Sequence, residues 1–422
     1  MNDVTLPLLQ RLIFPPARLA AILVGLAVPV SVAADNFLLA LVLLGGLAGW
    51  KSVVQMGCHH PVARAGWLLF GALLLATSYG ATPGQEALGI LGKYADLAFI
   101  PIFMRLLAGE RARRWAQYAF LGAMGITLLL SWSVGLHGLQ PARWMYAGAA
   151  DDLGSIFHSH ITQNNMMAFA VFLALLNCRA AGRGWQRWAW GGFALLGIGD
   201  ILFVVQGRTG YLILLVLLAW FGWTTLTRYL RQRGMAWNGQ RTAATLLLFL
   251  LAAGAIYQFS PRVHERVGAV ISEFQRWQPN QGGDTSTGQR LDFYLNTLQI
   301  VQQHPWLGVG TGGFPAAFAE QAAKTGALPT HNPHNEFLMI SVQTGALGLI
   351  CLLYLFACQW RGATGLASAW EQDAARGLVL AYVINGMLNS ALLDHADGLF
   401  FAWMTAILFA GLKPPALTLS AR

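Results

Sequence analysis

The residues best suited to chemistry precede a long apolar run. Residues 329–350 read PTHNPHNEFLMISVQTGALGLI and place His331 and His334 three positions apart. We expect Asn332 to cap a helix, with Pro333 at its first position and His334 in its first turn. The helix dipole would then keep the His334 imidazole neutral and able to act as a general base. A capping or interfacial histidine without a chemical role is the alternative interpretation.

Two arginines that could bind an anion stand in polar segments between apolar runs. Arg208 lies in the short segment QGRTGYL, and Arg290 opens an amphipathic segment in which Tyr294 follows four residues later on the same helix face. Ser286 and Thr287 are candidate caps for that helix. A planar guanidinium can donate to two phosphate oxygens at once, so this pair suits a phosphorylated ligand. The alternatives are an arginine that reaches the lipid headgroups and one that is only solvated on a helix surface.

Further basic residues extend this candidate anion-binding surface. Lys93 lies near the end of an apolar run, where it would either pair with Asp96, three residues later, or reach a phosphate group. Arg262 and Arg266 are four residues apart and could form one anion-binding face. The residues predicted to bind substrate are Lys93, Arg262, Arg266, Tyr294, His331 and Asn335.

Acidic residues and histidines do not form a recognisable metal motif. The candidates are Asp151, Asp152, His158 and His160 in one polar segment and Asp394, His395 and Asp397 in another. Neither spacing is typical of a metal site. The glycine-rich stretch GVGTGGF follows no predicted strand, so it does not indicate a dinucleotide site and instead suits tight turns beside a ligand or other helices. We therefore predict neither a metal nor a cofactor.

The composition indicates which elements must position these residues. The chain has 422 residues, of which 56% are hydrophobic and 11% are charged, and its mean hydropathy is +0.51. Soluble domains carry about 25% charged residues. Apolar runs of about 17–23 residues recur along the chain, as membrane-spanning helices require, whereas the short alternating segments of a transmembrane barrel do not. The sequence therefore predicts an all-α integral membrane protein.

Twelve apolar runs are predicted to span the membrane. They are 18–34, 37–54, 64–80, 88–107, 115–137, 161–178, 187–205, 209–228, 241–259, 336–358, 374–393 and 397–412. Helices 1–9 then occupy 1–259, one large and partly helical outer loop occupies 260–335, and helices 10–12 occupy 336–422. Nineteen of the 27 lysines and arginines fall on one side and seven on the other. This bias predicts that both termini are cytoplasmic, and it accounts for most of the +9 net charge without nucleic-acid binding.

The order of these motifs resembles the O-antigen ligase and polymerase superfamily. The resemblance rests on QGRTGYL, on the arginine-led helix and turn GQRLDFYLNTLQIVQQHPWLGVGTGGF, on PHNEFLMISVQTGALGLI and on TQNNMMAFAVFLALL. It extends over about residues 160–350, and the first 150 residues match mainly in topology. The resemblance implies a GT-C-like membrane glycosyltransferase in which His334 is the catalytic histidine and Arg208 and Arg290 are the two essential arginines.

The resemblance also implies a reaction. An O-antigen ligase transfers a glycan from undecaprenyl diphosphate to a hydroxyl of lipid A–core oligosaccharide, at the periplasmic face of the inner membrane, with inversion and without a metal. Chain length and the lack of a large outer C-terminal domain favour the ligase. The alternatives are an O-antigen polymerase or a protein O-oligosaccharyltransferase of the same superfamily. A lipid-linked glycan transporter is the alternative from another class, but its transport path would need polar groups through the bilayer, and here they crowd one face.

Overall fold

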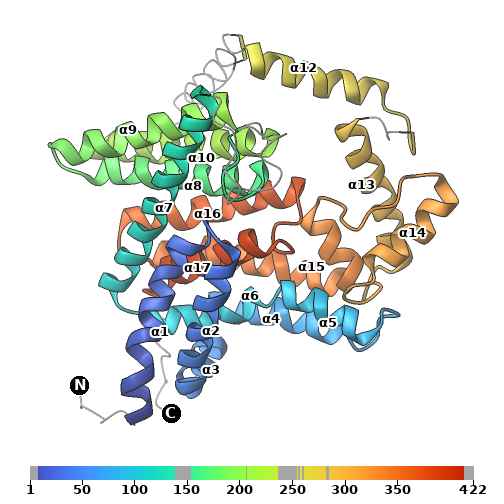
Figure 1. Ribbon diagram of the computed structural model, residues 1–422, viewed down its shortest axis with the longest axis horizontal. Helices are drawn as coiled ribbons and strands as arrows, with labels where there is room; N and C mark the ends of the chain where they lie inside the picture. Colours follow the sequence, from blue (N-terminus) through green and yellow to red (C-terminus); the bar gives the residue numbers. More distant parts are fainter. Residues whose placement is uncertain are drawn as a thin grey trace.

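The chain is helical throughout the part that the structure describes. The computed structural model describes residues 8–137, 154–205, 207–235, 254, 257–258, 261–281 and 285–412. These ranges contain α-helices with short 3-10 and π-helical segments and no strand (Figure 1). The predicted all-α class is therefore confirmed.

The helices form two series separated by the undescribed residues 138–153. The first series consists of α1 (Leu8–Ala27), α2 (Val32–Ala48), α3 (Trp50–His59), α4 (Pro61–Ala76), α5 (Gly84–Lys93), α6 (Asp96–Leu106) and α7 (Glu110–His137). The second consists of α8 (His160–Ala180), α9 (Trp185–Gly199), the π-helical η1 (Asp200–Val204), α10 (Arg208–Gln232), α12 (Pro261–Arg276), α13 (Ser286–Gln303), α14 (Phe314–Thr325), α15 (Glu336–Gly362), the 3-10 helix η3 (Ala363–Gly365), α16 (Ala369–Leu388) and α17 (His395–Phe409).

Several helices have the length and composition of membrane spans. Within the described ranges there are six: Gly84–Leu106, Glu110–Leu136, His160–Ala180, Trp185–Val204, Arg208–Gln232 and Glu336–Gly365. The bent pair α2 and α3 would make a seventh if it forms one span. The chain is thus a multi-pass membrane protein, and the number of twelve spans stays a prediction.

One of the predicted spans is sharply bent in the structure. The run 37–54 is divided at Gly49, where α2 and α3 meet at an angle of 91°. The run 88–107 falls within the candidate span Gly84–Leu106, in which Tyr94 and Ala95 separate α5 from α6 without a sharp bend. Average hydropathy does not detect such breaks, because residues at a turn can be as apolar as those in a helix. Most of the predicted span 241–259 lies outside the described residues.

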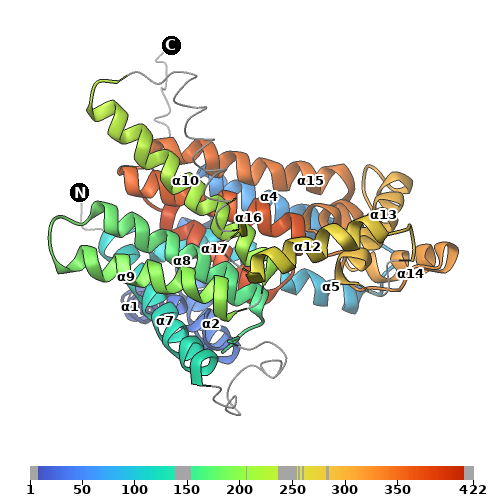
Figure 2. The same cartoon turned by 90° about the horizontal axis from the view of Figure 1, so that it is seen from above.

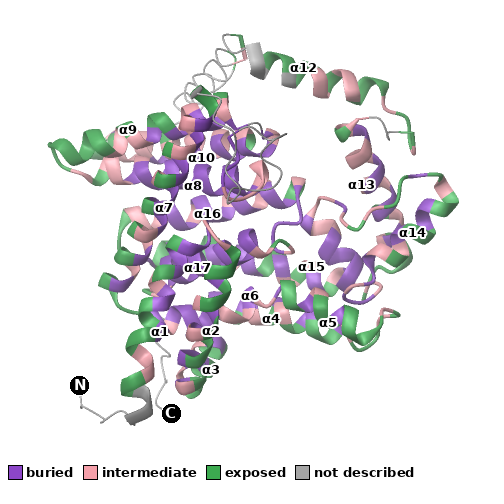
Figure 3. Ribbon diagram, viewed as in Figure 1, coloured by how far each residue is buried: buried purple, intermediate pink, exposed green. Residues whose placement is uncertain are grey.

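The central core is formed by helices that are buried on almost every side. On α17, the side chains of Phe400, Phe401 and Trp403 are fully buried, and Trp403 Nε1 donates a hydrogen bond of 2.8 Å to the carbonyl of Ala21 in α1. By contrast, α9 exposes apolar side chains such as Leu195 (Figure 3), as expected of a helix that faces lipid.

A second, smaller core fixes the outer helices. Phe293 of α13, Phe314 and Phe318 of α14, and Met339 of α15 are buried together. Viewed from above, α15 also runs alongside α4, with α13 and α14 at its N-terminal end (Figure 2). The start of α15 is therefore held by packing on both sides.

The glycine-rich stretch 308–314 meets a kink in α15. Gly345 interrupts that helix with φ +63° and ψ −154°. The N–H of Val309 donates to the carbonyl of Val342 at 2.7 Å. The N–H of Gly310 donates to the carbonyl of Gln343 at 3.0 Å. These bonds engage carbonyls that the kink deprives of helical partners, so the glycine run makes a tight turn beside another helix.

Candidate functional site

The structure places His334 before α15, so its predicted position in the first helical turn is wrong. The helix begins at Glu336, and Asn335 is its cap, accepting a hydrogen bond of 3.0 Å from the N–H of Leu338. His334 has φ +53°, in the left-handed region. The side chain of Asn332 accepts the N–H of His334 at 2.8 Å. This local asparagine turn competes with helix formation, so α15 begins only at Glu336.

The turn at His334 is held by hydrogen bonds from α13 and from the segment that follows α16. The Tyr294 hydroxyl on α13 lies 3.0 Å from the carbonyl oxygen of His334 and 3.0 Å from that of Met387 in α16. Asn332 Oδ1 also accepts a hydrogen bond of 2.8 Å from the hydroxyl of Ser390. A non-glycine residue at positive φ costs about 1–2 kcal/mol, and such conformations concentrate at functional sites.

The His334 imidazole is free to meet a ligand. Its ring is nearly parallel to that of Phe293, with centroids 6.3 Å apart and an angle of 19°. Its nitrogens make no hydrogen bond with any described residue. Burial lowers the pKa of His334, and the positive charge of Arg290 lowers it further. The direction of this pKa shift favours the neutral imidazole, and its causes are burial and Arg290 rather than a place inside a helix.

Arg208 joins three helices that lie far apart in the chain. It is the first residue of α10, and its Nη1 donates to the hydroxyl of Thr287 in α13 at 2.9 Å. Its Nη2 lies 3.5 Å from Oε1 of Glu273 in α12. Burial raises the pKa of Glu273, but hydrogen bonds from Thr287 and Arg208 and the charge of Arg208 outweigh it and bring the pKa below its ordinary value. Arg208 thus has a carboxylate partner.

Arg290 has no such partner. Its side chain is half-buried on α13 and makes no hydrogen bond or ion pair with a described residue. Burial lowers the pKa of the Arg290 guanidinium, the nearby Tyr294 opposes this change, and the charge of Arg208 adds to it. A buried cation beside a second cation is unfavourable unless an anion binds there. The arrangement is therefore suited to a ligand with more than one negative charge.

The helix cap before Arg290 differs from the prediction. Thr285 is the N-cap of α13, and its hydroxyl accepts a hydrogen bond of 3.1 Å from the N–H of Gly288. The predicted caps Ser286 and Thr287 lie in the first turn instead. The hydroxyl of Thr287 is engaged by Arg208. Three threonines or serines in succession all suit a cap, so the sequence does not decide between them.

Lys93 is not joined to this group by any described contact. It ends α5 and is exposed, and it does not pair with Asp96. Asp96 is buried and lies 3.8 Å from Nδ1 of His395. The predicted alternative of a Lys93–Asp96 pair is therefore wrong. The break between α5 and α6 separates the two residues, which a continuous helix would have placed on one face.

The other predicted substrate-binding residues have different positions. His331 is exposed beside the His334 turn. Asn335 uses both ends of its side chain within the protein, because it caps α15 and donates 3.1 Å to the carbonyl of Met387. The side chains of Arg262 and Arg266 lie outside the described residues, although the backbone of α12 is described.

The sequence reasoning missed one residue of the site, Glu273, and gave another, Asn332, the role of a helix cap. Glu273 holds Arg208 from α12, and Asn332 shapes the turn at His334 through its side chain. The sequence did contain a signal for the role of Asn332. This residue lies two positions before His334, which suits an asparagine turn as well as a helix cap. Glu273 had none, because its contact with Arg208 joins segments 65 residues apart.

The acidic and histidine groups serve other contacts. Among the described residues, no three His, Cys, Asp or Glu side chains converge as metal ligands do. His158 Nε2 lies 2.9 Å from the carbonyl oxygen of Val28, and His395 Nε2 lies 3.0 Å from Oδ1 of Asp35. Asp397 accepts a hydrogen bond of 2.6 Å from Asn165. Asp151 and Asp152 lie outside the described residues.

Comparison with known families points to the same part of the chain. Residues 193–353 match the family model described as O-antigen ligase. The match begins in α9, ends in α15 and includes Arg208, Arg290 and His334. None of the curated proteins compared with the chain matches it.

Proposed function

Because the chain belongs to the O-antigen ligase/polymerase superfamily, we propose that it transfers an O-antigen glycan from undecaprenyl diphosphate to a hydroxyl group of lipid A–core oligosaccharide. Members of the superfamily are glycosyltransferase-like enzymes that act on lipid-linked glycans. The observation that carries the proposal is the Arg290 guanidinium, which is half-buried near Arg208 and His334 and has no carboxylate partner among the described residues.

The two arginines bind the diphosphate of the donor. Glu273 and Thr287 hold Arg208 in place, and the donors of Arg290 are available to phosphate oxygens. Negative charge grows on the leaving oxygen as the glycosidic bond breaks. Fixed guanidinium groups stabilise that charge without reorganising, so the transfer is proposed to need no metal.

His334 is the general base. A ring nitrogen accepts the proton of the acceptor hydroxyl while the hydroxyl oxygen attacks the anomeric carbon from the face opposite the diphosphate. The bond between that carbon and the phosphate oxygen breaks, and undecaprenyl diphosphate leaves with the bonding electrons. The anomeric configuration is therefore inverted, and no covalent glycosyl–enzyme intermediate forms.

The membrane arrangement is part of the proposal. Twelve spans in a GT-C-like fold would divide the chain into 1–259, the loop 260–335 and 336–422, with both termini in the cytoplasm. The distribution of lysine and arginine supports a site that faces the periplasm of a bacterial inner membrane. The crowding of candidate groups at one face also supports catalysis rather than transport through the bilayer.

Further contacts to the substrate remain proposals at four positions. Lys93, His331, Arg262 and Arg266 are cations or polar groups that could meet the glycan, the acceptor or the lipid. Tyr294 and Asn335 are proposed to affect substrate binding by positioning His334. Tyr294 donates a hydrogen bond to the carbonyl of His334, and Asn335 donates one to the carbonyl of Met387 in α16.

The test is reconstitution with both acceptors. Purified protein is mixed with undecaprenyl-diphosphate O-antigen and lipid A–core in the presence of EDTA, and the products are separated by gel. A glycan ladder shifted onto lipid A–core is expected. Longer glycans that stay on undecaprenyl diphosphate would identify a polymerase, and loss of the ladder that one divalent ion restores would refute metal independence.

A further inference from the structure

A second group of arginines lies at the other end of α10 from Arg208. Arg228 follows Arg208 by 20 residues on the same helix, a distance of about 30 Å at 1.5 Å per residue. This distance is about the thickness of the hydrocarbon core. The group therefore lies at the opposite face of the membrane from the candidate active site, on the side predicted to be cytoplasmic.

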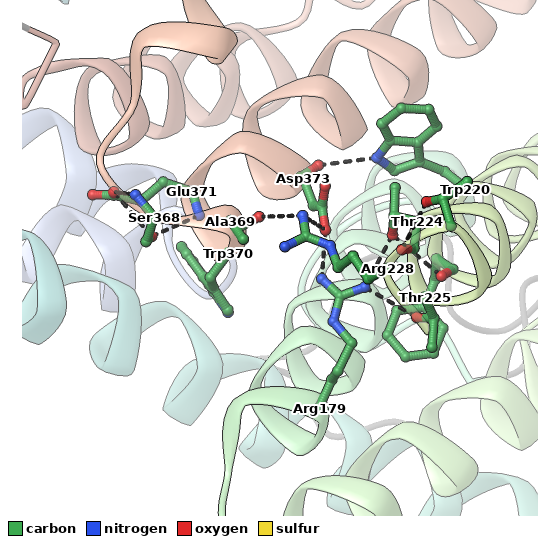
Figure 4. A network of polar contacts seen from close by, with 12 residues as sticks. Arg179, Trp220, Thr224, Thr225, Arg228, Ser368, Ala369, Trp370, Glu371 and Asp373 are labelled. Atoms are coloured by element: carbon green, nitrogen blue, oxygen red, sulfur yellow. Dashed lines mark hydrogen bonds and ion pairs between the residues drawn. The ribbon is translucent and has the colours of Figure 1, made fainter. Parts of the chain in front are cut away.

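One buried carboxylate engages two of these arginines. Oδ2 of Asp373 on α16 accepts a hydrogen bond of 2.7 Å from Arg228 and is also paired with Arg179 at the end of α8 (Figure 4). Nη1 of Arg179 reaches the hydroxyls of Thr224 and Thr225, at 3.0 Å each. Asp373 is only 2% exposed, so its charge is used entirely within this network.

A cavity opens beside the network. Its volume is about 650 Å³, and its lining includes Trp220, Trp223, Arg228, Arg231 and Arg376. The guanidinium of Arg376 lies 5.4 Å from the ring centre of Trp360. Its Nε is buried and has no hydrogen-bond partner among the described residues. An unpartnered buried donor of this kind requires an explanation, and a polar group bound in the adjacent cavity is one.

The charges in and around the cavity are unbalanced. Arg179, Arg228, Arg231 and Arg376 face or border it, and Asp373 is the acidic residue in the described lining. The neighbouring Glu371 lies 3.7 Å from Arg113 and caps α16 through Ser368, so its charge is used elsewhere. An anion would complete this site.

We propose that this cavity binds the phosphate headgroup of an anionic phospholipid of the cytoplasmic leaflet. Basic pockets between transmembrane helices on that side suit such headgroups, because arginine donates to two phosphate oxygens at once. Trp220 and Trp223 provide the flat amphipathic surface that is typical of the membrane–water boundary. The site is separate from the proposed transfer reaction and does not depend on it.

The test is lipid binding by the full chain in detergent. Native mass spectrometry is used to titrate the wild type with phosphatidylglycerol, with phosphatidylcholine and with inorganic phosphate. Phosphatidylglycerol is expected to bind in preference to phosphatidylcholine. Equal binding of the two lipids would overturn the proposal, and so would binding of inorganic phosphate without binding of phosphatidylglycerol.

Matched variants locate the bound lipid. Arg231→Gln with Arg376→Gln is expected to weaken phosphatidylglycerol binding about 25-fold, because each arginine contributes about a factor of five. The control is Arg183→Gln with Arg187→Gln, which removes the same charge from two exposed residues, the first between α8 and α9 and the second in the first turn of α9. An equal loss in both double variants would overturn the proposal. If the first variant does not fold, the exposed Arg231→Gln alone is expected to show a loss of about fivefold.

Discussion

Arg208 and Arg290 have the same charge but different surroundings. Arg208 is held by Glu273 and Thr287, whereas Arg290 has no described partner although it is half-buried. The Arg208 side chain is therefore fixed within the protein, whereas the N–H groups of Arg290 are available to a ligand. This difference also predicts different effects on stability when each residue is replaced.

Arg290→Gln is expected to weaken binding of undecaprenyl diphosphate by about 10- to 100-fold, because a hydrogen bond to a charged group contributes about 1.5–3 kcal/mol. Its melting temperature should not fall, since no described partner loses a charge. Arg208→Gln should lower the melting temperature, because it leaves Glu273 unpaired. Ligand binding and thermal unfolding are measured in detergent, with the exposed Lys324→Gln as control. Unchanged ligand binding by Arg290→Gln would contradict this role.

The rate of transfer is expected to depend on pH through His334. Its pKa is lowered by burial and by Arg290, so the base is lost only as pH falls below about 6.5. In Arg290→Gln the acid limb should move to higher pH, because a positive charge that lowers the His334 pKa is gone. His334 also affects the free energy of unfolding. Because its pKa is lowered in the folded state, the unfolded state binds the proton first as pH decreases, and the free energy of unfolding falls below about pH 6.5.

Initial rates between about pH 5 and pH 8 test this dependence, with the acid limb compared between wild type and Arg290→Gln. An acid limb that does not move in the variant would be inconsistent with a base at His334 next to Arg290.

At the scale of elements, α15 is the helix that connects the site to the rest of the fold. Its first turn follows the His334 turn. Near its kink at Gly345, its backbone carbonyls accept hydrogen bonds from the glycine-rich stretch that follows α13. A Cβ at Gly345 would lie 2.2 Å from the carbonyl carbon of Trp306. The kink therefore fixes the spacing between α13, which carries Arg290, and the start of α15.

Gly345→Ala is expected to lower the melting temperature and to reduce transfer. The positive φ alone costs at least about 1 kcal/mol for alanine, and the contact with the Trp306 backbone adds to this. Gly222→Ala on α10 is the control, because its Cβ would meet no atom within 4 Å. The control should be neutral or slightly stabilising. A Gly345→Ala variant as stable and active as the wild type would show that the kink is not required.

The sequence predicted the residues of the site better than the local structure around them. Arg208, Arg290, Tyr294 and His334 lie near one another in the structure, while their roles stay predictions. The start of α15 was predicted wrongly, because Asn332 and Asn335 both suit a cap, and in the structure the Asn332 side chain forms a turn with the His334 N–H while Asn335 caps the helix. The bend in the run 37–54 was missed because hydropathy averages over a turn.

At the scale of the whole molecule, the two charged regions lie at opposite ends of α10. Arg208 meets the outer helices α12 and α13, and Arg228 meets α16 at the other end. Hydropathy and charge counts suffice to predict a helical membrane protein of this kind. They do not determine which apolar helices cross the bilayer completely, because a bent pair such as α2 and α3 has the same composition as a straight span.

Labelling of single cysteines tests the proposed orientation. In a variant without Cys58, Cys178, Cys351 and Cys358, His331→Cys is expected to react with a membrane-impermeant maleimide added to intact spheroplasts. Arg183→Cys should react only after the membrane is opened, because it lies at the predicted cytoplasmic end of α8 and is exposed in the protein. The opposite pattern would reverse the topology and place the site in the cytoplasm.

The central claim is that His334 activates the acceptor at a diphosphate held by arginine. The most direct test is single-turnover transfer by His334→Asn, because asparagine tolerates the positive φ of this position but lacks a basic nitrogen. Donor binding should be retained, and the rate should fall by about 10²- to 10⁴-fold. Transfer at the wild-type rate by a variant that binds donor normally would contradict the claim.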